Sequence, residues 1–105
     1  MARDRHRVKL MADHGAFPLW WLNRHGGGPM IGPDELPLSP ELKVRLLAWA
    51  AVYDQLAQTN YSWPSDHALT AFVQQGQALL TDLRKELGSA YELWYFNEST
   101  HRLEQ

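Results

Sequence analysis

The sequence predicts a two-layer α+β fold, in which an antiparallel helix hairpin packs on a small β-sheet of about three strands in the order β-β-α-α-β. Three observations support this. Apolar residues alternate near the N-terminus, recur every three or four residues in two central segments, and form an aromatic run near the C-terminus. With 105 residues and 45% hydrophobic residues, the chain fits a single domain, residues 1–105.

The first two strands are expected in the N-terminal quarter of the chain. Residues 7–12 alternate between an apolar side and a mixed side, which is typical of a half-buried strand. Residues 17–22 resume the apolar character and are rich in aromatics. Because Pro18 cannot donate a hydrogen bond to a neighbouring strand, this second strand should lie at a sheet edge or begin after the proline.

Three segments are expected outside regular structure. Residues 1–6 form a basic tail, and residues 97–105 form a polar, frayed C-terminal tail. Glycines and prolines are dense in residues 23–38, which predicts a long loop. Loops of this length are usually functional or mobile.

Two helices follow, and their ends are marked by capping residues. Ser39 is a good N-cap for the first helix and Pro40 suits its first position, while Ser65 or Asp66 caps the second. Gly88 stands where a left-handed C-terminal cap is expected. The connection between the helices is short, so we expect an antiparallel hairpin.

Gly76 falls in the middle of the second helix, on its apolar side. Glycine costs about 1 kcal/mol there relative to alanine. We expect it to allow close approach of the first helix at Ala50 and Ala57, so that Gly76→Leu overpacks the contact between helices. The alternative is a glycine that is merely tolerated.

The last strand, residues 91–96, is apolar on both faces, although the helices can cover only one. Exposed aromatic surface commonly marks a protein interface. The candidate interface residues, from this strand and the second, are Trp20, Trp21, Trp94 and Phe96. Two alternatives stay open: the 23–38 loop folds over the sheet and covers it, or the aromatic face mediates self-association.

The sequence contains no motif that is typical of a catalytic, metal-binding or cofactor-binding site. The chain has no cysteine, and its Asp-His pairs at 13–14 and 66–67, with His25, lack the spacing of a metal site. The run His25 to Gly28 resembles an esterase oxyanion loop, but no G-x-S-x-G motif accompanies it. No dinucleotide or phosphate-binding motif is present. We therefore expect no catalytic, cofactor or metal residues.

Charge and hydropathy narrow the class of partner. The formal net charge is −2, which argues against a dedicated nucleic-acid binder, although Arg3, Arg5, Arg7 and Lys9 give the N-terminus a basic character. No apolar run is long enough for a membrane span, and no secretory signal is present. We expect a cytoplasmic protein with a protein partner or self-association.

A small-ligand binding protein is the competing hypothesis. Its pocket would lie between the Gly/Pro-rich loop and the helix ends, with His25, Trp63 and His67 as candidate site residues.

Two stretches also resemble a group of small, uncharacterised actinobacterial proteins. They are VKLMADHGAFPLWW, residues 8–21, and LPLSPELKVRLLAWAAVYDQ, residues 36–55. This chain has His14 where that group has a tyrosine, and its Gly-rich loop is longer. The resemblance implies a stand-alone bacterial cytoplasmic protein and supplies no activity or catalytic residues.

The leading hypothesis is a non-enzymatic protein-interaction module, and one specific form is an immunity or antitoxin-like protein that neutralises a toxin. Small size, mild acidity, the missing catalytic motifs and the excess of aromatic surface all suit that role.

Overall fold

The computed structural model describes residues 6–25 and 27–105 and contains a four-stranded sheet with two α-helices. The strands are β1 (His6–Leu10), β2 (Leu19–Trp21), β3 (Tyr91–Asn97) and β4 (Arg102–Glu104). The helices are α1 (Pro40–Asp54) and α2 (Asp66–Leu87), with short 3₁₀ turns η1 (Gln55–Thr59) and η2 (Gly88–Ala90). The predicted α+β class is confirmed.

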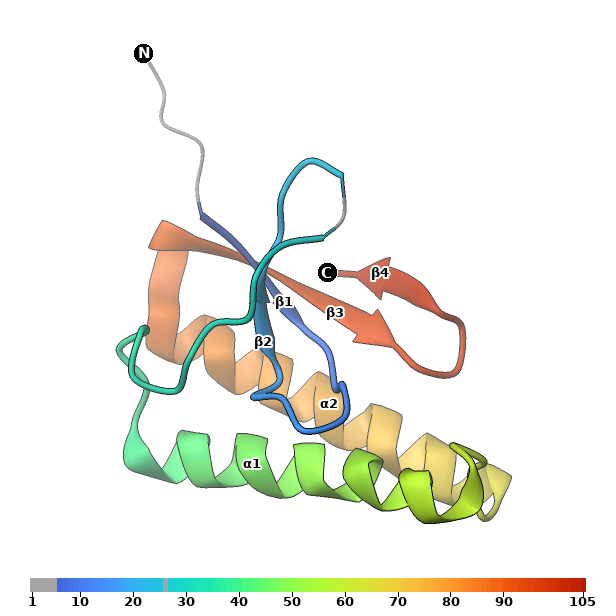
Figure 1. The fold of residues 1–105 in the computed structure, drawn as a ribbon. Coiled ribbons are helices and arrows are strands. Elements are labelled where there is room, and N and C mark those ends of the chain that lie inside the picture. The colour runs from blue at the N-terminus through green and yellow to red at the C-terminus, as the bar shows by residue number, and fades with distance from the viewer. Residues whose placement is uncertain (1–5, 26) are drawn as a thin grey trace.

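The sheet is mixed and has the strand order β2-β1-β3-β4. The chain makes the antiparallel pair β1–β2, passes through both helices, and returns as β3, which runs parallel to β1. The strand β4 then pairs antiparallel with β3. Figure 1 shows the two helices on one side of the sheet, so the other side has no helical layer.

The C-terminal segment differs from the prediction. Residues 97–105 were expected to be a frayed polar tail, but they turn at Glu98–His101 and form β4. The turn is stabilised by Asn97, whose side-chain oxygen accepts hydrogen bonds from the backbone and hydroxyl of Ser99 at 2.8 and 2.6 Å. The sheet therefore has four strands rather than about three.

The N-terminal strands follow the prediction more closely. The strand β2 begins directly after Pro18 and lies at the sheet edge. His6, which was assigned to the basic tail, is the first residue of β1, and its ring packs edge-on against Trp21 and Tyr91. The rest of that predicted tail, residues 1–5, lies outside the described residues.

A single apolar core lies between the sheet and the helices. Trp49 of α1 is at its centre, because its ring stacks on Phe72 at a centroid distance of 4.4 Å and its indole N–H donates to the Phe72 carbonyl. The sheet supplies alternate residues of β1 and β3, and the 23–38 loop adds buried apolar side chains. These residues are Val8, Leu10, Leu93, Tyr95, Ile31, Leu36 and Leu38.

The N-cap of α1 also connects the two helices. The Ser39 hydroxyl accepts from the Leu42 backbone, as predicted for an N-cap. The Glu86 carboxylate of α2 accepts from the Ser39 backbone and hydroxyl, both at 2.7 Å. Ser65 caps α2 by accepting from the Ala68 backbone.

We expect Ser39→Ala to lower the free energy of unfolding by about 1–2 kcal/mol, because it removes a cap and a hydrogen bond to a carboxylate. Ser65→Ala removes a cap alone and should cost about 1 kcal/mol or less. Urea denaturation of both variants measures the difference. Equal losses would show that the bond to Glu86 contributes nothing.

The atoms nearest to a side chain at Gly76 belong to Tyr95 of β3, and not to Ala50 of α1 or Ala57 of η1 as expected. A Cβ atom at Gly76 would instead lie 2.6 Å from the hydroxyl oxygen of Tyr95 and 2.7 Å from two of its ring carbons. Ala57 is exposed. The glycine therefore makes room for the largest fully buried side chain of β3.

The Tyr95 hydroxyl is buried and has no hydrogen-bond partner among the described residues. Burial raises the pKa of this phenol far above its ordinary value, and the charges of Glu98 and Glu104 add to the rise. The neutral form is therefore strongly favoured in the folded protein.

We expect Tyr95→Phe to leave the free energy of unfolding unchanged or to raise it by about 1 kcal/mol near neutral pH, because an unsatisfied buried hydroxyl is removed. Above about pH 10, where the unfolded chain loses the phenol proton and the folded chain keeps it, the wild type loses stability and the variant lacks this contribution. Urea denaturation from pH 7 to 10.5 should show the difference growing. A constant difference would contradict the raised pKa.

Candidate interaction surface

The strand register divides the sheet residues into a helix-facing set and an outer set. Lys9 of β1 lies between Trp20 of β2 and Trp94 of β3, and directly paired residues share a face. Phe96 pairs with Leu103 on the same side. We call this surface the outer sheet face; its members are Arg7, Lys9, Trp20, Met30, Glu92, Trp94, Phe96 and Leu103.

The outer sheet face brings together three of the four predicted interface residues. Trp20, Trp94 and Phe96 all lie on it and are half-buried. Trp21 points to the other side, since it pairs with Val8, and it packs against the core. Grouping Trp21 with the others was therefore incorrect, because neighbouring residues of a strand face opposite ways.

Both tryptophans of this face are fixed by hydrogen bonds. The Trp20 indole N–H donates to the Met11 carbonyl at 2.9 Å, and the Trp94 indole N–H donates to the Glu92 carboxylate at 2.9 Å. Arg7 holds the same carboxylate oxygen at 3.0 Å. The rings are therefore held in place before any partner arrives, which reduces the entropy lost on binding.

Lys9 is a member of this face that the sequence analysis did not select. Only 8% of the residue is exposed, because it lies between the two tryptophans. Burial lowers the pKa of its ammonium group, while the negative charge of Asp13 opposes that change. The edges of the face are apolar and open, with Met30 44% and Leu103 38% exposed.

The start of the Gly/Pro-rich loop reaches over part of the outer sheet face, where Asn23 and Arg24 line a small pocket together with Trp94 and Leu103. The loop then runs along the edge of β2, where Trp21 donates to the Pro29 carbonyl at 2.9 Å and Ile31 donates to the Leu19 carbonyl at 2.8 Å. Gly28 permits this approach, since a Cβ there would lie 1.9 Å from the Trp21 carbonyl oxygen. The loop tip rises on the side of the sheet away from the helices (Figure 1).

Among the residues of the alternative ligand site, His25 lies apart from Trp63 and His67 (Figure 1). Trp63 lies in the connection that precedes α2 and packs on Phe72 with a ring centroid distance of 4.9 Å, and His67 is an exposed residue in the first turn of α2. His25 lies in the loop, where its backbone donates to Asn23. In Figure 1 the loop tip and the connection between the helices are at opposite ends of the molecule.

The end of the sheet where β1 and β3 terminate is acidic. Asp54 accepts from the Gly15 backbone at 3.0 Å and lies 3.7 Å from the His14 ring nitrogen. Burial raises the pKa of the nearby Glu98, while His101 opposes that rise and Asp13 adds to it. Within residues 6–25 and 27–105, no group of three His, Asp or Glu side chains is arranged to hold a metal ion.

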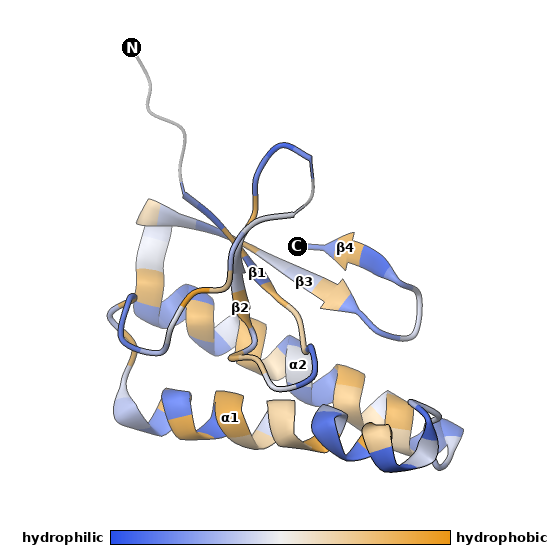
Figure 2. Cartoon of the chain, in the orientation of Figure 1, coloured by the Kyte–Doolittle hydropathy of each residue, from blue (hydrophilic) through white to orange (hydrophobic). Residues whose placement is uncertain are grey.

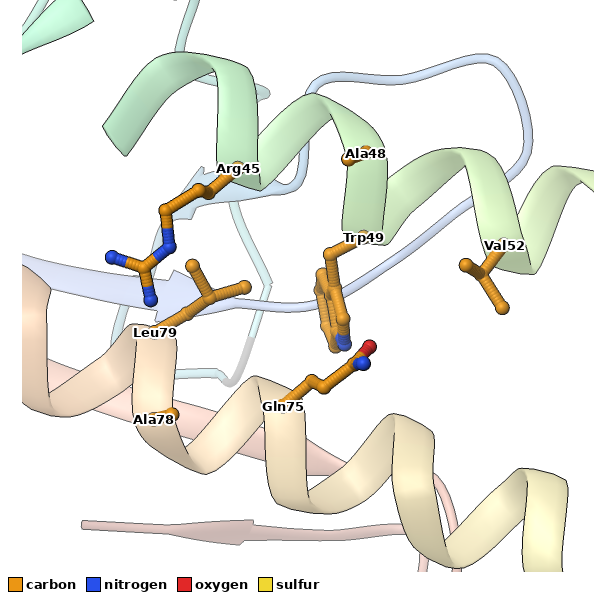
Figure 3. Close-up of a pocket in the computed structure, with 7 residues that line it drawn as sticks. All are labelled: Arg45, Ala48, Trp49, Val52, Gln75, Ala78 and Leu79. Atoms are coloured by element: carbon orange, nitrogen blue, oxygen red, sulfur yellow. The ribbon is translucent and has the colours of Figure 1, made fainter. Parts of the chain in front are cut away.

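A second surface, which the sequence analysis missed, lies on the helix hairpin. A groove of about 390 Å³ runs between α1 and α2, and Figure 3 shows its lining residues, which include Arg45, Trp49, Val52 and Leu79. Beside it, Val44 is 65% and Leu47 is 53% exposed. With Ala48, Ala51 and Val52 they recur at helical spacing, so α1 has a second apolar stripe.

None of the helices in the described residues is long and apolar enough to cross a membrane. A comparison with curated proteins gives no match. A family model described as Serratia CdiI immunity protein-like matches residues 6–98, from the first residue of β1 to just beyond β3. Since this span covers most of the sheet and both helices, the chain belongs to the Serratia CdiI immunity protein-like family.

Proposed function

We propose that this chain is an immunity protein, which binds a protein toxin through the outer sheet face and thereby blocks it. The family supports the immunity role, because its description names an immunity protein. The observation that carries the choice of surface is the set of half-buried aromatic residues, Trp20, Trp94 and Phe96, on a sheet face without a helical layer.

Aromatic side chains on a rigid sheet suit tight protein binding. Tryptophan is strongly enriched among the residues that dominate interface energetics. The two indoles are already oriented by hydrogen bonds to Met11 and Glu92, so binding does not have to order them. The apolar margins at Met30 and Leu103 would widen the contact.

The experiment begins with affinity purification of the tagged chain from its native host and identification of the captured protein. That protein is then expressed alone and together with this chain in a test bacterium. We expect growth inhibition with the partner alone and restored growth on co-expression, together with a stoichiometric complex by light scattering. A captured protein that is harmless when expressed alone would contradict the immunity role.

Light scattering on the purified chain also tests self-association. A dimer that persists at low concentration and is broken by Trp94→Ala would mean that a second copy covers the outer sheet face, and the toxin would have to bind elsewhere.

A further inference from the structure

A small pocket lies on the outer sheet face beside the loop that follows β2. It has a volume of about 170 Å³. Its lining residues come from β1, β3, β4 and the loop, and they are Arg7, Leu22, Asn23, Arg24, Trp94 and Leu103. A pocket of this size is smaller than the ~300–1,000 Å³ of typical small-molecule sites, so it suits one or two side chains of a docking protein.

The charge around this pocket is opposite in sign to that of the whole chain. The formal net charge of the chain is −2. Among the described residues of the outer sheet face and the pocket, three are basic (Arg7, Lys9, Arg24) and one is acidic (Glu92). Figure 2 shows the start of β1 and the loop tip in the blue of hydrophilic residues, as expected for a polar rim.

Each wall of the pocket offers a different contact. Arg7 is positioned by Glu92, which holds its Nε atom at 3.0 Å, and half of the Arg7 side chain is exposed. Arg24 is exposed in the loop. Guanidinium groups carry a positive charge in proteins and donate hydrogen bonds in a fixed geometry. Leu103 and Trp94 contribute apolar surface to the same pocket, and the Trp94 N–H already donates to Glu92.

We infer that the toxin segment that docks on the outer sheet face inserts a carboxylate side chain between Arg7 and Arg24, with a neighbouring apolar side chain against Trp94 and Leu103. This inference rests on the proposed function and specifies its partner chemistry. Arginine recognises carboxylates with paired, charge-assisted hydrogen bonds. An aromatic wall next to it adds the apolar contact that anchors interface residues.

The inference can be tested without the toxin, by NMR with two peptide probes. The probes are N-acetyl-Asp-Leu-amide and N-acetyl-Asn-Leu-amide, which differ only in the side-chain charge. We expect the Asp probe to shift the Trp94 indole N–H signal in a saturable way, and the Asn probe to bind about tenfold more weakly or not at all. Equal shifts with both probes would overturn the inference.

Two substitutions test whether the Asp probe binds in this pocket. Arg24→Gln removes a loop charge that is exposed, and it should weaken the Asp probe about tenfold. Arg84→Gln, an exposed arginine of α2 that lines a different hollow, is the matched control and should leave the affinity unchanged. Equal effects of the two substitutions, or none from either, would contradict a specific carboxylate pocket.

A single-stranded oligonucleotide is the third probe, because basic and aromatic side chains also bind nucleic acid. If it shifts the same signals more strongly than the Asp probe, the pocket recognises phosphate rather than a protein carboxylate, and the inference is wrong.

Failure of the inference and failure of the proposed function give different results. A toxin that binds with undiminished affinity to Arg24→Gln would overturn the carboxylate pocket and leave the immunity role in place. A chain that binds the Asp probe through Arg24 but does not protect against its captured partner would support the pocket and overturn the immunity role.

Discussion

Replacing Gly76 with alanine is expected to lower the free energy of unfolding by up to about 2 kcal/mol. The added Cβ would lie 2.6–2.7 Å from three atoms of the Tyr95 side chain, so the ring would have to shift within the buried core. Overpacking of this kind costs about 1–3 kcal/mol, and the better helix propensity of alanine offsets about 1 kcal/mol. The melting temperature should fall by roughly 5 °C for each kcal/mol that is lost.

A double-mutant cycle with Tyr95 identifies the cause. In the background of Tyr95→Leu, which removes the ring, Gly76→Ala should become neutral or stabilising by about 1 kcal/mol, because only the gain in helix propensity remains. In the background of Tyr95→Phe the ring carbons that lie 2.7 Å from the added atom are retained, so the loss should persist. Gln77→Ala, at the exposed neighbouring position, controls for the general effect of alanine in α2.

Urea denaturation and thermal melting of these variants give the required free energies. If Gly76→Ala destabilises equally with leucine and with tyrosine at position 95, the close approach to the ring is not its cause. If it stabilises the wild-type chain, the glycine is merely tolerated.

The features of the fold that were predicted correctly depend on residues that are close to one another in the sequence. Ser39, Pro40, Ser65 and Gly88 lie where the helix ends were expected, because capping depends on neighbouring residues. The missing N–H of Pro18 likewise predicted an edge strand or a strand that begins after the proline, and β2 meets both conditions. Such features need no knowledge of distant contacts.

The parts that were missed depend on distant contacts. The strand β4 has only one apolar residue, Leu103, and it is ordered by pairing with β3 rather than by its own pattern. The parallel pairing of β1 with β3 joins residues that are more than eighty positions apart. The contact of Gly76 with β3, instead of α1, follows from how α2 lies on the sheet.

The alternation of side chains along a strand predicts which residues share a face of the sheet, and it therefore predicts part of the candidate surface. It placed Trp94 and Phe96 on one face, and the same period of two separates Trp20 from Trp21. The second apolar stripe of α1 was also readable from the sequence at positions 44, 47, 48, 51 and 52, since it has helical spacing. The buried residues of α1 already give this helix an apolar face, so the amphipathic pattern does not require a second one. The buried residues are Leu42, Leu46, Trp49 and Ala50.

Under the proposed immunity function, truncation of Trp94 is expected to have the largest effect on binding of the toxin. Trp94 is central on the outer sheet face, where it lies beside Lys9 and lines the pocket with Leu103. A central interface tryptophan is typically worth 2 kcal/mol or more, so Trp94→Ala should weaken the complex at least ~30-fold. The side chain is only half-buried in the free chain, and the fold should remain intact by circular dichroism.

Two controls distinguish a local anchor from a general loss of apolar surface. Trp63→Ala removes a tryptophan of the same size that packs on Phe72, in the helical layer, and should leave the affinity unchanged. Leu47→Ala removes a more exposed apolar side chain from the second stripe of α1 and should also have no effect. If Leu47→Ala weakens binding and Trp94→Ala does not, the toxin docks on the helix hairpin.

The substitution Trp94→Phe then separates the contribution of the ring from that of its orientation. Phenylalanine keeps an apolar ring but cannot donate to Glu92, so the bond that fixes the indole is lost while the ion pair between Glu92 and Arg7 is kept. If pre-organisation matters, Trp94→Phe should show an affinity intermediate between wild type and Trp94→Ala, mainly through faster dissociation. Surface plasmon resonance measures both rates. An affinity equal to wild type would mean that ring area alone anchors the toxin, and that the hydrogen bond to Glu92 serves only the free chain.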